Sequence, residues 1–123
     1  MTRAGVARAE VRLGHRSVAL DAIRRAERAT EEAPDDPSNG GQRGARAEAY
    51  QDIAEAYAAL ATHQVTSPAD AKPHWTAACR MWQRSADVWA DLRRRGMLAG
   101  GDASKADTVA RELDRCKARL DGR

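Results

Sequence analysis

The sequence predicts an all-α fold, and three observations support this prediction. Apolar residues recur at spacings of three and four, the β-type alternation of apolar and polar residues is nearly absent, and β-branched residues are scarce. The three tryptophans, Trp75, Trp82 and Trp89, lie seven residues apart. Seven residues come within ~20° of two full helical turns, so these side chains share one face of a helix. With 123 residues, the chain is expected to form a single domain over residues 1–123.

Two helices are expected before residue 34, and together they form a first helix pair over residues 3–33. The first covers about residues 3–13, and Gly14 ends it as a left-handed C-terminal residue. Ser17 is expected to cap the second helix, which must stop before Pro34. The apolar stripe of this second helix consists of Ala19, Ala22, Ile23 and Ala26.

A second helix pair is expected over residues 45–95, between two stretches of turn residues and with a long internal loop. Residues 34–44, PDDPSNGGQRG, contain turn residues and no large apolar side chain, so we expect a flexible loop. The third helix covers about residues 45–62 and is followed by a loop over residues 62–70. Its apolar residues follow helical spacing: Tyr50, Ile53, Ala54, Tyr57, Leu60 and Ala61.

The fourth helix carries the tryptophans, and the sequence allows two starting points for it. Ser67 and Pro68 are typical of a cap and a first helical residue, whereas a start at Pro73 would avoid a proline inside the helix. The helix is expected to end at Gly96, after three arginines that favour the negative end of the helix dipole. The tryptophan stripe is interpreted as core, although the same stripe could line a ligand pocket.

The fifth helix is expected over residues 104–121, where Ser104 and Asp107 form a possible capping box. Its apolar residues make a single narrow stripe, which predicts a closing helix that buries one face. The stripe consists of Val109, Leu113, Cys116 and Leu120.

Small, large and small residues recur at one spacing in the second and fourth predicted helices, and this spacing resembles the tetratricopeptide repeat (TPR) family. The tail from residue 74, HWTAACRMWQRSADVWADLRRRGML, to the final helix also resembles the end of TPR regions that often follow kinase or cyclase domains in some bacterial signalling proteins. The second helix of each TPR carries small, large and small residues, which here are Ala19, Ile23 and Ala26, and again Ala78, Trp82 and Ser85. The resemblance implies a right-handed helix–turn–helix stack of two helix pairs plus a C-terminal capping helix.

The same resemblance implies a non-catalytic protein–protein interaction module, or scaffold, that binds a peptide or helix of a partner on its concave helical face. TPR proteins contact their partners mainly through the first helix of each pair. The corresponding exposed residues are Arg8, Arg12, Glu48, Gln51 and Glu55. An alternative is that these residues pair with one another across the stack. Self-association into a homo-oligomer is also open, because two helix pairs and a capping helix can leave an end uncovered.

Charge is distributed in blocks along the chain, with a net of −6 over residues 29–70 between basic blocks on either side. Such blocks can attract one another inside the fold, or they can present a surface of one sign to a partner. The alternative function is therefore a nucleic-acid-binding helical domain that uses the arginines of the fourth helix. These are Arg80, Arg84, Arg93, Arg94 and Arg95, and a solvated helix face is the other interpretation of them.

No motif in the sequence indicates an enzyme, a metal site or a cofactor. His15, His63 and His74 lie at turns and helix ends without ligand spacing to a carboxylate or a cysteine. Cys79 and Cys116 are expected to be buried free thiols, unless the fold brings them together. The chain has no long apolar run and begins without an apolar signal core, so we expect a cytoplasmic protein without a membrane segment.

Overall fold

A computed structural model describes residues 16–63 and 67–122, and the regular structure of this part of the chain is entirely α-helical. Helix α2 covers Arg16–Glu32, α3 Gly40–His63, α4 Pro68–Arg94 and α5 Asp102–Leu120. The all-α prediction is therefore confirmed for the described residues. The first predicted helix, over residues 3–13, lies outside them.

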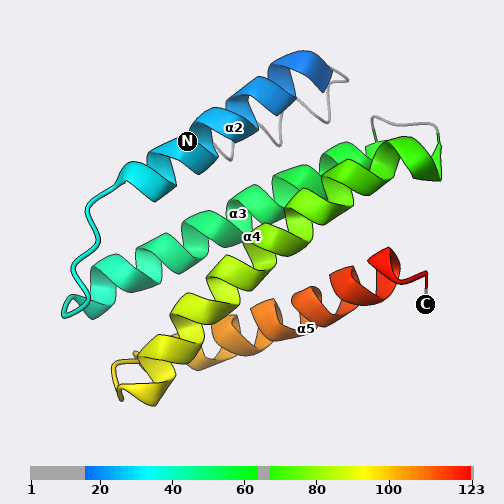
Figure 1. Cartoon of the computed structure of the whole chain (residues 1–123). Coiled ribbons are helices and arrows are strands. Elements are labelled where there is room, and N and C mark those ends of the chain that lie inside the picture. The colour runs from blue at the N-terminus through cyan, green and yellow to red at the C-terminus, as the bar shows by residue number, and fades with distance from the viewer. Residues whose placement is uncertain (1–15, 64–66, 123) are drawn as a thin grey trace.

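Helices α3 and α4 form the centre of the fold (Figure 1). They are the two longest helices, with 24 and 27 residues. Helix α2 packs against α3, and α5 packs against α4. In the view of Figure 1, α2 and α5 lie on opposite sides of the α3–α4 pair.

Small residues on α3 and α4 allow these two helices to approach closely. Ala47 and Ala54 on α3 and Ala78 on α4 are completely buried. Ser85 is buried as well, and its hydroxyl donates a 2.7 Å hydrogen bond to the carbonyl oxygen of Ala47 on the facing helix. This bond satisfies the buried hydroxyl, so a polar residue is tolerated at the centre of the helix contact.

Two of the three tryptophans belong to the core. Trp82 and Trp89 are 5% and 2% exposed, so the core interpretation is confirmed for them. Trp75, nearer the start of α4, is half-buried and packs against the edge of the core. The stripe is therefore continuous along the helix, but it changes from interior to surface at its N-terminal end.

The prediction of a flexible loop over residues 34–44 is wrong for its second half, because α3 begins at Gly40. The side-chain oxygen of Asn39 accepts a 2.9 Å hydrogen bond from the backbone N–H of Gln42, which is the geometry of an N-terminal cap. The turn before α3 is also tied to the end of α4, where the guanidinium of Arg95 donates to the carbonyl of Pro37 at 2.6 Å. These tertiary contacts override the turn composition of the segment.

Helix α4 begins at the first of the two predicted starting points, and it ends as predicted. Ser67 accepts a 3.1 Å hydrogen bond from the backbone N–H of Asp70, and Pro73 lies inside the helix rather than at its start. At the other end, Gly96 has a φ of +67°, in the left-handed region. The backbone N–H of Met97 donates to the carbonyl of Leu92 at 2.8 Å, which completes a Schellman motif.

Two predicted caps are not observed. Ser17 lies inside α2, which begins one residue earlier, and its side chain is exposed. Helix α5 begins at Asp102 after Gly101, and the hydroxyl of Ser104 donates to the carbonyl of Gly101 at 3.2 Å instead of accepting a bond from the helix. A serine or threonine one turn inside a helix can form such backward bonds, and spacing alone does not distinguish them from caps.

The prediction that Cys79 and Cys116 are free thiols is wrong, because they form a disulfide between α4 and α5. Their Cα atoms are 5.6 Å apart across a sequence separation of 37 residues. Both residues are buried. The packing of α5 along α4 brings the two cysteines together, which was the condition under which the free-thiol expectation would fail.

Candidate functional site

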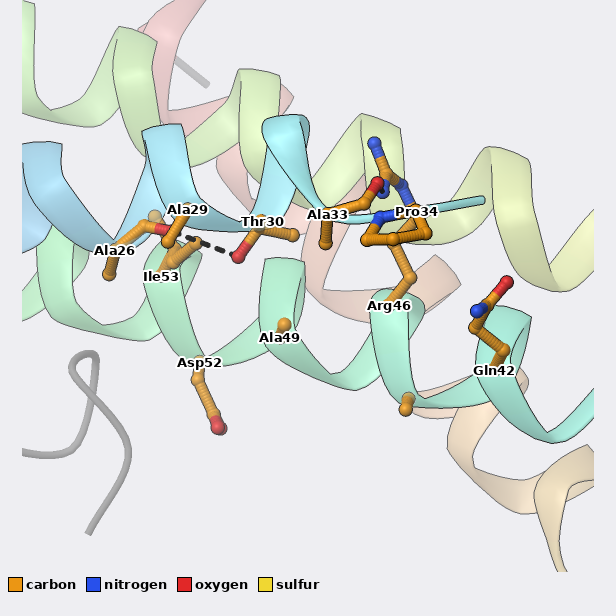
Figure 2. A pocket seen from close by; sticks show the side chains of 11 residues that line it. Ala26, Ala29, Thr30, Ala33, Pro34, Gln42, Arg46, Ala49, Asp52 and Ile53 are labelled. Carbon is orange, nitrogen blue, oxygen red and sulfur yellow. Dashed lines mark hydrogen bonds between the residues drawn. The ribbon is translucent and has the colours of Figure 1, made fainter. Parts of the chain in front are cut away.

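A groove with a volume of about 420 Å³ lies between α2 and α3 in the described part of the structure (Figure 2). We call it the α2–α3 groove. It runs from the middle of α3 to the turn that follows α2. Its lining residues are Ala26, Ala29, Thr30, Ala33, Pro34, Gln42, Ala45, Arg46, Ala49, Asp52 and Ile53.

The groove exists because its walls are built largely from alanine. Alanine contributes three of the five lining residues of α2 and its following turn, and two of the lining residues of α3. Ala29, Ala33 and Ala45 are exposed, and Ala49 is half-buried. A methyl side chain extends one carbon from the backbone, so neither helix fills the space between them. The result is an open apolar trough with little bulk of its own.

The polar groups at the end of the groove nearest Pro34 are occupied by contacts within the chain. The guanidinium of Arg46 donates to the carbonyls of Ala33 and Glu31, at 3.3 Å each, and so satisfies acceptors at the C-terminal end of α2. The side-chain oxygen of Gln42 accepts a 2.5 Å hydrogen bond from the backbone N–H of Asp36. These groups shape the groove and present no arrangement suited to acid–base or nucleophilic chemistry.

A buried tyrosine holds the three helices together beside the groove. The Tyr57 hydroxyl on α3 donates a 2.9 Å hydrogen bond to Glu27 on α2, and Glu27 also pairs with Arg80 on α4 at 3.2 Å. Burial, together with the hydrogen bond to the Glu27 carboxylate, raises the pKa of Tyr57 to about 12. The phenol therefore stays protonated and keeps donating across the neutral pH range, which fixes α2 relative to α3.

Of the five residues expected to bind a partner, Glu48, Gln51 and Glu55 lie within the described residues, on α3. Arg8 and Arg12 lie outside the described residues. The carboxylate of Glu48 pairs with Lys105 on α5, and Gln51 donates a 3.3 Å hydrogen bond to Glu55 one turn further along α3. None of the three α3 residues lines the α2–α3 groove. The sequence left open that these residues pair with one another across the stack; the bond between Gln51 and Glu55 instead runs along one helix, and Glu48 pairs with a residue outside this set.

The arginines of α4 all form ion pairs with carboxylates. Arg80 and Arg84 pair with Glu27 and Glu31 on α2, at 3.2 and 2.6 Å. Arg93 pairs with Asp107 on α5 at 3.2 Å. The two arginines that follow it, at positions 94 and 95, both pair with Asp91 on their own helix, at 2.7 and 3.4 Å.

Of these pairs, Arg84 with Glu31 joins the acidic block, residues 29–70, to the basic block that follows it, whereas the carboxylates of the other pairs lie outside the acidic block.

A second and smaller hollow, of about 270 Å³, lies where the end of α5 meets the start of α4. Trp75 and Arg119 face each other there, with the guanidinium carbon 4.0 Å from the centre of the tryptophan ring. The other lining residues are Pro68, Ala71, Lys72, Leu120 and Gly122. The exposed part of the tryptophan stripe therefore borders this hollow and not the α2–α3 groove.

Within residues 16–63 and 67–122, no group of three or more histidine, cysteine, aspartate or glutamate residues is placed to hold a metal ion. None of the helices described here combines the length and the apolar character that a membrane span requires. The site that sequence reasoning missed is the α2–α3 groove itself. Alanines at positions 26, 29 and 33 and at 45 and 49 repeat at helical spacing, and this was the available signal.

The chain matches no protein-family model, no curated protein and no solved structure.

Proposed function

We propose that this protein is a non-catalytic protein–protein interaction module, TPR-like in its helix stacking, that binds an amphipathic helix or peptide of a partner protein in bacterial signalling or complex assembly. The observation that carries the proposal is the α2–α3 groove, an exposed apolar trough walled by alanine. Figure 2 shows these short side chains along both walls. Amphipathic helices dock into grooves of this kind through large side chains spaced three, four and seven residues apart.

The burial of the small and large residues supports TPR-like stacking. Ala19 and Ile23 on α2 are completely buried, and Ala26 is 5% exposed. The matching positions on α4, Ala78, Trp82 and Ser85, are buried as well. In a repeat stack these positions are the ones at which the second helix of a pair meets its neighbours.

The shape of the groove indicates what kind of segment it would accept. Its walls offer methyl groups and its volume of about 420 Å³ is comparable to that of several large apolar side chains, so the partner is expected to supply the bulk. Burying each leucine-sized side chain of the partner would contribute roughly 1.5–3 kcal/mol. Binding of this origin depends weakly on salt.

The alternative function, nucleic-acid binding through α4, has less support. Each of the five arginines concerned is already paired with a carboxylate, so a phosphate would have to compete with these pairs. Phosphate binding would also weaken steeply as salt rises. Salt dependence therefore separates the two functions.

The test compares capture of partner proteins by the wild-type chain and by variants that fill the groove. Ala29→Arg and Ala45→Arg each place a long charged side chain in the trough. Both positions are exposed and helical, so the fold should tolerate arginine. The matched controls are Ala90→Arg and Ala110→Arg, at exposed helical positions of α4 and α5.

A partner that binds in the groove should be captured from nuclease-treated lysate by the wild type and by the control variants. The amount captured by either groove variant should be at least tenfold lower. Its binding should change little between low and moderate salt. Equal capture by groove and control variants would show that the partner uses another surface. Loss of all capture on nuclease treatment would favour the nucleic-acid alternative.

A further inference from the structure

The disulfide between Cys79 and Cys116 lies in the half of α5 that has the fewest other attachments. The first half of α5 is held by buried Ala106 and Val109 and by the ion pairs that join this helix to its neighbours in the described structure. These pairs are Lys105 with Glu48 on α3 and Arg93 on α4 with Asp107. Both involve residues before position 108, so the second half of the helix depends on other contacts.

Beyond Leu113, the side chains of Cys116, Arg119 and Leu120 attach α5 to α4. Cys116 is 3% exposed and covalently joined to Cys79. Arg119 stacks over the Trp75 ring, and Leu120 is half-buried beside the 270 Å³ hollow. A stacked arginine at an open site contributes little, and a hollow leaves packing contacts unmade. The covalent link is therefore the strongest attachment in this half.

We infer that the Cys79–Cys116 disulfide is a redox-controlled cross-link that holds the second half of α5 against α4. Its reduction by a dithiol releases residues 113–120 from α4. This cross-link joins α4 and α5 and is separate from the groove, which lies between α2 and α3. Release would uncover the part of α4 that carries Trp75 and Cys79. Disulfides that form in a reducing compartment are usually transient and are catalytic or redox-sensing, whereas permanent structural disulfides are typical of an oxidising compartment.

The chemistry is thiol–disulfide exchange. One thiolate of the dithiol attacks a sulfur of the protein disulfide and forms a mixed disulfide, releasing the other protein sulfur as a thiolate that takes up a proton. The second thiol of the reductant loses its proton and attacks the reductant's own sulfur in the mixed disulfide. This step releases the second protein sulfur, which is also protonated. Two electrons and two protons thus pass to the protein, and the reductant leaves as its own disulfide.

Local opening gives the reductant access to sulfurs that are buried in the closed structure. Segments with few buried apolar contacts open most readily, and the end of α5 beside the hollow is such a segment. The Sγ atom of Cys116 lies 3.6 Å from the carbonyl oxygen of Trp75, so a reduced thiol there can still form a weak bond to α4. In the oxidised chain a covalent bond holds the end of α5 on α4. After reduction only non-covalent contacts hold it there, so it can open and close readily.

The test is hydrogen exchange on the full chain, measured in the oxidised state and after reduction with dithiothreitol. We expect the amides of residues 113–120 to lose protection by roughly tenfold or more beyond the loss seen in α3, because the α3 amides report only the fall in global stability. Reoxidation should restore the protection. Two results would overturn the proposal: unchanged protection of residues 113–120, or an equal loss in all helices, which would make the disulfide a general structural link.

The double variant Cys79→Ala/Cys116→Ala serves as the control for side effects of the reductant. It should show the exchange pattern of the reduced chain whether or not dithiothreitol is present. A variant whose α5 remains as protected as that of the oxidised wild type would contradict the inference. Since the main comparison uses one sequence in two oxidation states, it does not depend on the folding of this variant.

Discussion

At the residue scale, the carboxylate of Asp91 pairs with three arginines. It accepts from Arg94 and Arg95 on its own helix and from Arg43 on α3, at 2.7, 3.4 and 3.1 Å. Burial by itself raises the pKa of Asp91. The hydrogen bonds from Arg95 and Arg94 and the charges of Arg95 and Arg43 outweigh this, so the pKa lies below its usual value of 3.8. The side chain thus links the end of α4 to the start of α3.

Asp91→Asn should lower the free energy of unfolding at neutral pH. It should also make that free energy fall less steeply as the pH is lowered. Because the pKa of Asp91 is lower in the folded state, the unfolded chain binds more protons as pH falls. The stabilisation is present above the unfolded pKa of about 3.8 and is lost as pH falls below it and through the lower pKa of the folded state. Thermal denaturation across this range should show the gap between wild type and variant closing. A constant gap would contradict the assignment.

Two glycines should respond in opposite ways to alanine. A Cβ atom at Gly44 in α3 would meet Trp89 at 3.7 Å, an ordinary van der Waals contact, so Gly44→Ala should stabilise the protein by about 0.5–1 kcal/mol. Gly96 has a φ of +67°, so Gly96→Ala should destabilise it by about 1–2 kcal/mol. Urea denaturation measures both. A loss of stability in Gly44→Ala would show that the helix contact is tighter than this distance indicates.

At the scale of elements, the tryptophan stripe of α4 passes from core to surface. The loss of stability caused by replacing a tryptophan with alanine should therefore be larger for a buried tryptophan than for a half-buried one. Trp82→Ala removes a side chain that is 5% exposed and should cost about 3–5 kcal/mol. Trp75→Ala should cost clearly less, because Trp75 is half-buried and borders a hollow. Urea denaturation of both variants tests this. Equal losses would indicate that the contact of Trp75 with α5 carries more energy than its burial suggests.

The same elements show which structural features local sequence can predict. The spacing of apolar residues predicted α3, and Ser67 and Gly96 predicted the ends of α4, because helix periodicity and caps are local properties. The start of α3 at Gly40 was missed. It depends on Asn39 as a cap and on tertiary contacts such as the bond from Arg95 to Pro37. A segment rich in turn residues gives no local indication of such contacts.

For the whole molecule, prediction was limited by how the helices are placed relative to one another. The α2–α3 groove is a property of two alanine-rich faces that meet without filling the space between them, and neither face shows this alone. Glu48, Gln51 and Glu55 were expected to bind a partner because of the resemblance to TPR proteins. The structure places them outside that groove, in contacts with α5 or along α3. Periodicity shows which residues share a face, but not which faces enclose a space.

The disulfide also acts on the whole molecule, through the unfolded chain. It closes a loop across 37 residues, and the chain-entropy relation for a loop of this length gives about 4 kcal/mol of stabilisation. Cys79→Ala/Cys116→Ala should therefore unfold at lower urea than the oxidised wild type, with a loss of about 2–4 kcal/mol. The wild type measured in dithiothreitol should match the variant, since both lack the constraint on the unfolded chain. A variant as stable as the oxidised wild type would mean that the repacked alanines or residual structure in the unfolded chain offset the lost link.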